Sequence, residues 1–213
     1  MKIIDLTHTL CSGMPVFPGD EPPVISRVST IEQNGYTSHR LTLSTHTGTH
    51  LDAPAHMLPH GAVLNRLPID YFIGKGAVID LTGLNASEIR LSDLKPHEDL
   101  FKRSDYILFR TGWDRFWGID RYFRDFPVLS LEAAIWIHSF QLKGIGLDTI
   151  SADEATSTTV PIHKTLLERS VIIENLTNLG ELPSTGFLFS CFPLKLENGE
   201  ASPIRATALI LDA

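Results

Sequence analysis

The chain has 213 residues, of which 43% are apolar and 20% charged, and its formal net charge at pH 7 is −7. Such a composition is ordinary for a soluble globular protein, and the length allows a proper hydrophobic core. The negative charge argues against the phosphate backbone of a nucleic acid and against an anionic membrane as binding partner. No apolar run approaches the roughly 20 residues that a membrane-spanning helix needs.

Two features of the sequence bear on location. The cysteines, Cys11 and Cys191, are far apart and too few for a disulfide framework or a thiolate metal cluster. The first residues include Asp5 and no long apolar core, so they do not have the form of a signal peptide. We therefore expect a cytoplasmic, reducing location.

The N-terminal part of the chain predicts strands separated by one long loop. A short strand is expected within residues 2–10, and the prolines and glycine of residues 14–23 predict a loop. Alternating, β-branched residues predict strands at Val24–Thr30 and Thr37–Thr45, with Asn34-Gly35 as the turn signal between them.

Residues 46–56, His-Thr-Gly-Thr-His-Leu-Asp-Ala-Pro-Ala-His, concentrate groups that bind divalent metals such as zinc. On a helix, Asp52 would point away from the face shared by His46 and His50. On one flat strand, His46 and His50 would lie roughly 13 Å apart, too far for one ion. The chain must therefore curl, and Gly48 permits this. We predict a strand ending in a tight loop that wraps a metal. For any one of these histidines alone, a surface loop residue or a satisfied core histidine would be the better reading.

The middle of the chain predicts a loop at Leu58–Asn65 and a short helical turn from Pro68. Apolar runs predict buried strands at Gly76–Leu81 and Tyr106–Arg110, and capped helical turns are expected over Ser87–Leu94.

The C-terminal half alternates helix and strand, which is typical of an α/β layer. Ser130 is the expected N-cap of a helix over Ser130–His138. Further predicted elements are a strand at Gly144–Asp148, a helix at Pro161–Leu167, a strand at Val171–Leu176, and closing strands at Thr185–Leu196 and Arg205–Leu211 joined by a hairpin turn at Asn198-Gly199.

Glu174 lies inside the apolar strand Val171–Leu176. A carboxylate in that position is costly unless it is paired or binds a metal. This is an argument from physical chemistry for Glu174 as a metal ligand. No repeat, linker or low-complexity segment interrupts the chain, so we expect one domain over residues 1–213.

Residues 46–56 resemble the HxGTHxDxPxH signature of the cyclase family of metal-dependent hydrolases, which includes bacterial kynurenine formamidase (arylformamidase) and isatin hydrolase. Weaker similarity is found over residues 14–20, 106–113, 144–153 and 163–176. The resemblance implies an α/β fold of the swivelling β/β/α type, in which helices flank a mixed β-sheet core. It also implies a homo-oligomer, either a dimer or a tetramer.

The resemblance further implies a site for two divalent metal ions, expected to be zinc, although the same ligands accept manganese or iron. His46, His50 and Asp52 would bind the first ion. Asp52 would also bridge to a second ion that is held by His163 and Glu174. His56 would remain free for proton transfer, for which its ordinary pKa is suitable.

Three other residues have alternative readings. Phe17 takes the place of a family tryptophan in a substrate-binding loop, where it could stack on an aryl substrate or simply be buried. Asp148 could orient a ligating histidine or cap a loop. Arg110 could bind a substrate anion, but a structural salt bridge is the expected role.

The predicted activity is hydrolysis of a small-molecule amide by metal-activated water, with His56 protonating the departing nitrogen. The first expected substrate is N-formylkynurenine, which would give kynurenine and formate. A cyclic amide such as isatin is the alternative substrate, and a non-catalytic metal-binding domain is the alternative of another class. His56 is a base beyond what a purely structural site needs, which favours an enzyme.

Overall fold

The computed structural model describes residues 1–84 and 86–211. Within these residues, nine strands form one sheet. They are β1 (Lys2–Asp5), β4 (His50–Asp52), β5 (Ile73–Asp80), β7 (Tyr106–Arg110), β9 (Gly144–Leu147), β10 (Val171–Glu174), β11 (Phe187–Ser190), β12 (Ala201–Pro203) and β13 (Thr207–Ile210).

The order of strands across the sheet is β1-β13-β11-β5-β7-β9-β10-β4-β12. The neighbours among β5, β7, β9 and β10 are parallel, and the pairs towards both edges are antiparallel. The expected α/β fold with a mixed sheet is therefore confirmed.

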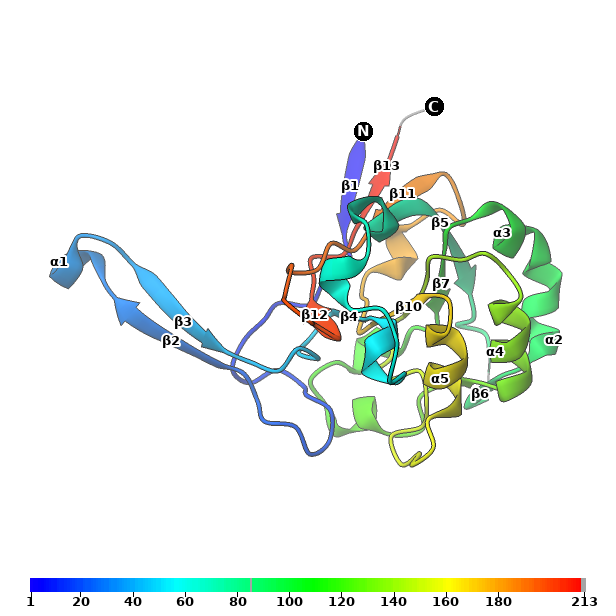
Figure 1. Ribbon diagram of the computed structural model, residues 1–213, viewed down its shortest axis with the longest axis horizontal. Helices are drawn as coiled ribbons and strands as arrows, with labels where there is room; N and C mark the ends of the chain where they lie inside the picture. The colour runs from blue at the N-terminus through cyan, green and yellow to red at the C-terminus, as the bar shows by residue number, and fades with distance from the viewer. Residues whose placement is uncertain (85, 212–213) are drawn as a thin grey trace.

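Helices cover one face of this sheet, as Figure 1 shows. The predicted N-cap is confirmed at Ser130, whose hydroxyl accepts a hydrogen bond from the Ala133 amide at 3.1 Å. The helices on this face are α2 (Leu91–Leu94), α3 (Glu98–Arg103), α4 (Leu131–His138) and α5 (Pro161–Leu167), whereas α1 (Ile31–Asn34) lies away from the sheet.

The sequence of the central strand β7 is apolar without interruption because both faces of the strand are buried. Ile107 and Phe109 belong to the apolar cluster on the helix side, whereas Tyr106 and Leu108 belong to the cluster on the opposite face. All four side chains are fully buried. A parallel strand that is covered on both faces needs apolar residues at every position.

Two smaller sheets stand apart from the main one. Strands β6 (Glu88–Ile89) and β8 (Val128–Leu129) pair in parallel. Strands β2 (Val24–Ser29) and β3 (Ser38–Thr42) pair in antiparallel fashion, and α1 joins them at the tip. In Figure 1 this hairpin, here called the arm (residues 24–42), projects away from the rest of the molecule, here called the body.

One predicted element was wrong, and one connection differs from the predicted one. Over Ser87–Leu94 we expected only helical turns, but Glu88–Ile89 forms β6, and α2 begins after Arg90. The two closing strands pair with each other as predicted, as β11 and β13. The turn at Asn198 does not join them directly, because it leads into β12, which pairs with β4 at the far edge of the sheet.

The remaining predicted strands and helices are confirmed in position, with ends that differ by a few residues. Among the residues that the structure describes, no helix has the length and apolar character to cross a membrane.

Candidate metal centre and its cavity

The segment with three histidines folds as a turn followed by a strand. Gly48 adopts a left-handed φ of +69°, and a Cβ there would meet the side chains of Met14 and Leu10 at 2.8 and 2.9 Å. Only glycine fits this position without displacement. The turn brings His46 back towards β4, so that its Nδ1 lies 2.9 Å from Asp52 Oδ1.

The predicted curl at Gly48 is present, but its order along the chain is the reverse of the expected one. The loop precedes the strand, and a 3₁₀ turn at Pro54–His56 follows it. The reason is geometric. Residues two positions apart on an extended strand point to the same side. His50 and Asp52 share one side because the chain is extended between them as β4, so the loop before the strand must carry His46.

The register between β10 and β4 brings the carboxylate of Glu174 close to that of Asp52. Strand β4 lies between β10 and β12, and Glu174 on β10 is directly opposite His50. The Glu174 Oε2 atom lies 3.5 Å from His50 Nε2, and its Oε1 atom lies 3.1 Å from His163 Nε2. Glu174 is only 4% exposed, and its buried carboxylate faces the imidazoles of His50 and His163.

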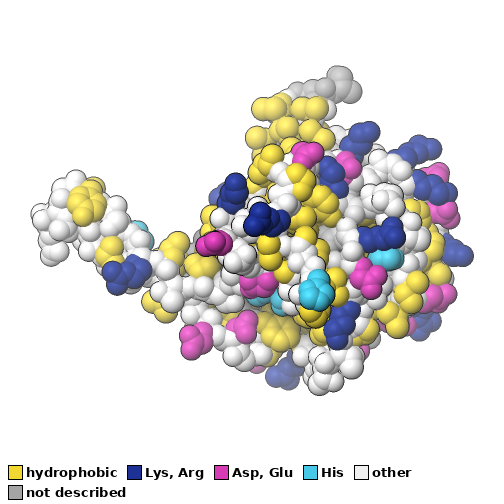
Figure 2. Space-filling view, in the orientation of Figure 1, with side chains coloured by type: hydrophobic (Ala, Val, Ile, Leu, Met, Phe, Trp, Pro, Cys, Tyr) yellow, Lys and Arg dark blue, Asp and Glu magenta, His cyan; other side chains and the backbone are white. Residues whose placement is uncertain are grey.

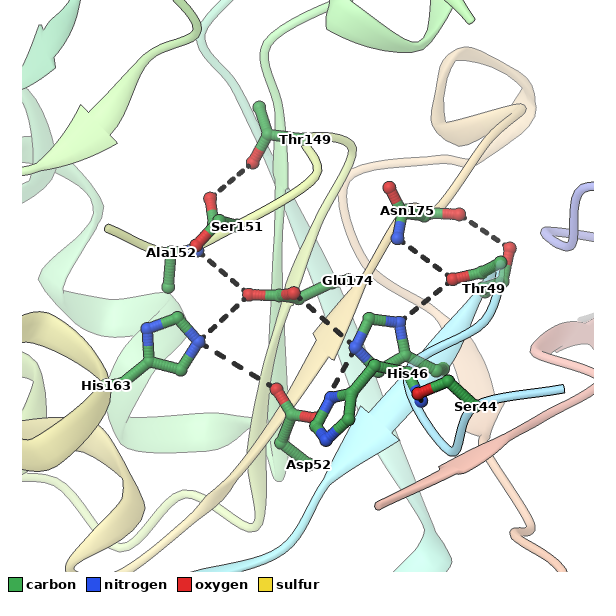
Figure 3. A network of polar contacts seen from close by, with 12 residues as sticks. Ser44, His46, Thr49, Asp52, Thr149, Ser151, Ala152, His163, Glu174 and Asn175 are labelled. Atoms are coloured by element: carbon green, nitrogen blue, oxygen red, sulfur yellow. Dashed lines mark hydrogen bonds and ion pairs between the residues drawn. The ribbon is translucent and has the colours of Figure 1, made fainter. Parts of the chain in front are cut away.

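Figure 3 shows His163 of α5, Glu174 of β10 and Asp52 of β4 directed towards one another, with His46 beside Asp52. His163 Nε2 is 3.9 Å from Asp52 Oδ2. Two stretches that are far apart in the sequence, residues 46–52 and 163–174, therefore deliver their side chains to one point.

Hydrogen bonds fix which nitrogen of two histidines faces the centre. His50 Nδ1 lies 2.9 Å from the carbonyl of Gly48, and His163 Nδ1 lies 2.6 Å from Asp153 Oδ2. A carbonyl or carboxylate oxygen can only accept, so each Nδ1 carries the proton. Each Nε2 therefore faces the centre and presents its lone pair to a metal when the ring is neutral.

A buried chain of hydrogen bonds holds the turn in place. Asn175 donates to the Gly48 carbonyl at 2.9 Å and accepts from the Tyr122 hydroxyl at 2.7 Å. The Thr49 hydroxyl donates to the Asn175 carbonyl at 2.6 Å. The turn is thereby anchored to the C-terminal half of the chain.

The electrostatics of the site favour a cation. Burial opposes a positive charge on His50, yet the Asp52 and Glu174 carboxylates outweigh it and raise the pKa of His50 to about 9. Burial also opposes charge on His163, whose pKa is raised to about 10 chiefly by Asp153 and Glu174. Conversely, His50 and His46 hold the pKa of Asp52 well below its usual value, against the effect of burial.

A further observation indicates that these nitrogen and oxygen atoms suit a divalent metal. His50 Nε2 and both Asp52 oxygens are buried without a well-formed hydrogen bond. Buried polar atoms without partners are costly. One candidate ligand atom from each of His46, Asp52 and His56 lies within 4.8 Å of the others, and the same holds for His50, Asp52 and Glu174. Asp52 belongs to both groups.

The candidate centre opens into a cavity of about 320 Å³. His56 and Phe17 are both half-buried at its wall. Burial lowers the pKa of His56 below its ordinary 6.5, and the nearby imidazoles of His46 and His163 act in the same direction. All the residues predicted for the site line this cavity: Phe17, His46, His50, Asp52, His56, His163 and Glu174.

Asp148 does not orient a histidine. Its carboxylate accepts hydrogen bonds from the Thr111 amide and hydroxyl and from the Gly112 amide, so it caps a loop. The residue that faces a histidine is Asp153, which the sequence reading left without a role. Arg110 makes the expected structural ion pair, at 2.7 Å from Asp80.

Glu200 was also missed. Its Oε1 accepts a hydrogen bond from Thr45 at 2.6 Å and lies 3.6 Å from His46 Nε2. No local signal marks Glu200, since it reaches the site only through the pairing of β12 with β4. Asp153 could have been found from its position ten residues before His163, in the loop that leads to the histidine's helix.

Comparison with known proteins agrees with this fold and site. The Cyclase family, described as "Putative cyclase", matches residues 4–154. The kynurenine formamidase of Erythrobacter litoralis (strain HTCC2594) is 33% identical over 207 residues, covering 96% of this chain and 92% of the relative.

Solved structures are similar over almost the whole length. An isatin hydrolase bound to the product analogue thioisatinate has a TM-score of 0.88 at 23% identity, covering 99% of this chain and 93% of that one. A potential metal-dependent hydrolase with cyclase activity has a TM-score of 0.82 at 29% identity, covering 100% and 99%. Fold, site and relatives together define a metal-dependent hydrolase. The chain belongs to the cyclase family.

Proposed function

We propose that this chain is an arylformamidase-type amide hydrolase that converts N-formylkynurenine to kynurenine and formate. The observation that carries the proposal is the convergence of His50, Asp52, His163 and Glu174 at a cavity whose wall also presents a free imidazole, His56. The kynurenine formamidase relative, at 33% identity, supports this substrate class.

The proposed ligands of a first divalent ion are His46, His50 and Asp52. Asp52 would also bind a second ion, together with His163 and Glu174. Zinc is the expected metal, and manganese or iron would suit the same donors. Such a pair of ions, when bound, lowers the pKa of water and stabilises negative charge on a carbonyl oxygen.

His56 is assigned to proton transfer, although its distance from His46 and Asp52 would also suit a ligand. Its lowered pKa leaves it neutral at pH 7 and able to accept a proton from water. The same nitrogen then donates this proton to the amide nitrogen, which leaves as a neutral amine. An unprotonated amide nitrogen is a poor leaving group, so this donation is essential.

Phe17 supplies the binding surface for an aryl group. It packs at the edge of an aromatic cluster that includes Trp113 and Tyr122, and it faces the same cavity as the candidate ligands. A flat aromatic wall suits stacking with the ring of a kynurenine. Ile150 and Val160 add further apolar lining.

The proposal includes a homo-oligomer and a cytoplasmic location. Both cysteines are free thiols, Cys11 exposed and Cys191 buried, which is compatible with a reducing compartment.

The test is a metal analysis combined with hydrolysis assays on N-formylkynurenine and isatin. We expect about two ions per chain and turnover of N-formylkynurenine with kcat/KM on the order of 10⁴ M⁻¹s⁻¹ or more. Faster ring opening of isatin would replace the substrate but keep the hydrolase site. Protein that binds no metal would refute the proposed centre.

Substituting Asp153 by asparagine is expected to weaken metal binding about 10- to 100-fold. Asp153 holds His163 through Nδ1 and accepts hydrogen bonds from the Ile162 and His163 amides at 3.0 and 2.9 Å. Asparagine has one acceptor oxygen and can keep only one of these two amide hydrogen bonds, so we also expect a loss of about 1–3 kcal/mol of stability. The measurement is competition with a chelator of known affinity.

The matched control is Glu154→Gln, which makes the same chemical change at the neighbouring, exposed position. It should bind metal like the wild type. An unchanged dissociation constant in Asp153→Asn would show that His163 does not need its carboxylate partner.

A further inference from the structure

The cavity wall carries one acidic side chain that the proposed metal centre does not use. Asp20 lines the cavity together with Phe17, whereas Asp52 and Glu174, the other two carboxylates of the wall, face histidines. Asp20 is exposed, and no residue that the structure describes makes a hydrogen bond or an ion pair with its carboxylate. The Asp20 carboxylate is therefore available to a group of the substrate.

A tight turn fixes Asp20 beside Phe17. The Asp20 amide donates a hydrogen bond to the Phe17 carbonyl at 3.0 Å. Between them lie Pro18 and Gly19, whose φ is +103°, and proline followed by glycine is the pair that a type II turn favours. The first and last Cα atoms of such a turn lie within about 7 Å of each other. One short segment therefore presents an aromatic ring and a carboxylate to the cavity together.

The cavity wall offers no side-chain cation to a negatively charged substrate group. Among the described residues that line it, none is a lysine or an arginine, and much of the lining is apolar. In Figure 1 the loop before β2 lies at the root of the arm, and Figure 2 shows acidic side chains gathered on that part of the body. The electrostatic field on this side of the cavity therefore attracts a cation and repels an anion.

We propose that Asp20 binds an ammonium group that the substrate carries near its aryl ring, and that it disfavours an anionic group in the same place. This inference rests on the proposed hydrolysis of N-formylkynurenine, which has an ammonium group on a short chain attached to its ring. With the ring against Phe17, this chain extends towards Asp20, where a charge-assisted hydrogen bond holds the ammonium group. Asp20 is thus a specificity-determining residue.

The test is calorimetric titration of the purified protein with kynurenine and with its desamino analogue, which keeps the carboxylate and lacks the ammonium group. The variant is Asp20→Asn. We expect it to bind kynurenine about tenfold more weakly than the wild type, a typical loss for a hydrogen bond to a charged group. The same variant should bind the desamino analogue more tightly, because a like charge has been removed. A general distortion of the cavity would not produce effects of opposite sign.

Two controls accompany this titration. The aryl ketone without the amino-acid group, ortho-aminoacetophenone, should bind the wild type and Asp20→Asn equally. Glu21→Gln removes a charge at the neighbouring exposed position, which does not line the cavity, and should bind every ligand like the wild type.

Three results would overturn the inference. They are a wild type that binds none of these ligands, an Asp20→Asn variant that binds kynurenine as tightly as the wild type, and a variant that binds all the ligands more weakly by the same factor. The titration needs no turnover, so its outcome is distinguishable from a failure of the proposed amide hydrolysis.

Discussion

Replacing Asp52 by asparagine is expected to remove bound metal from both halves of the centre and to lower turnover by a factor on the order of 10³ or more, about 4 kcal/mol of transition-state stabilisation. Asp52 is fully buried and is the one residue common to both groups of candidate ligands. Asparagine keeps the shape of the side chain but removes the negative charge and one of the two ligand oxygens.

Elemental analysis of the purified variant gives the metal content, and a hydrolysis assay gives the turnover. Asp148→Asn is the matched control, because it is the same substitution at an equally buried aspartate whose carboxylate accepts hydrogen bonds from Thr111 and Gly112. The control should lose about 1–3 kcal/mol of stability and keep its metal. Wild-type metal content in Asp52→Asn would rule out the shared-ligand arrangement.

Replacing His56 by alanine is expected to leave the metal content unchanged while lowering kcat by about 10²- to 10⁴-fold, the usual contribution of a positioned acid–base group. His56 is half-buried at the cavity wall, and its ring centroid lies 4.2 Å from that of His46 and 6.0 Å from that of His163. It can reach a substrate in the cavity from there without being needed to hold a cation.

This variant separates the two roles that the distances allow for His56. Loss of metal together with activity would make His56 a ligand and leave the proton transfer to another group. Retained metal, together with partial rescue by added imidazole, would establish proton transfer. His60→Ala, four positions further on and exposed, is the control and should behave like the wild type.

Much of the candidate site could be predicted because its charged side chains would be costly to bury without partners. Glu174 within an apolar strand is a buried charge that demands a partner, and that argument needs no knowledge of the fold. The spacing from His46 to Asp52 likewise forces a bend at Gly48. Both conclusions follow from local geometry, which is why they survive in the folded structure.

The errors concern information that is not local. A turn signal such as Asn198-Gly199 shows where the chain reverses, but not which strand the next segment will join. Two aspartates in one loop, Asp148 and Asp153, are chemically alike. Only the placement of α5 against that loop decides that Asp153 meets His163 and Asp148 does not.

The position of β4 sets when the metal centre can form during synthesis. Its three residues pair only with β10 and β12, which are made more than one hundred residues later. A nascent chain that has emerged as far as the cavity loop at residue 160 carries His46, His50 and Asp52 but neither His163 nor Glu174. The proposed second ion therefore lacks its ligands until β10 has been made, so its capture would be a late event that reports the pairing of β10 with β4.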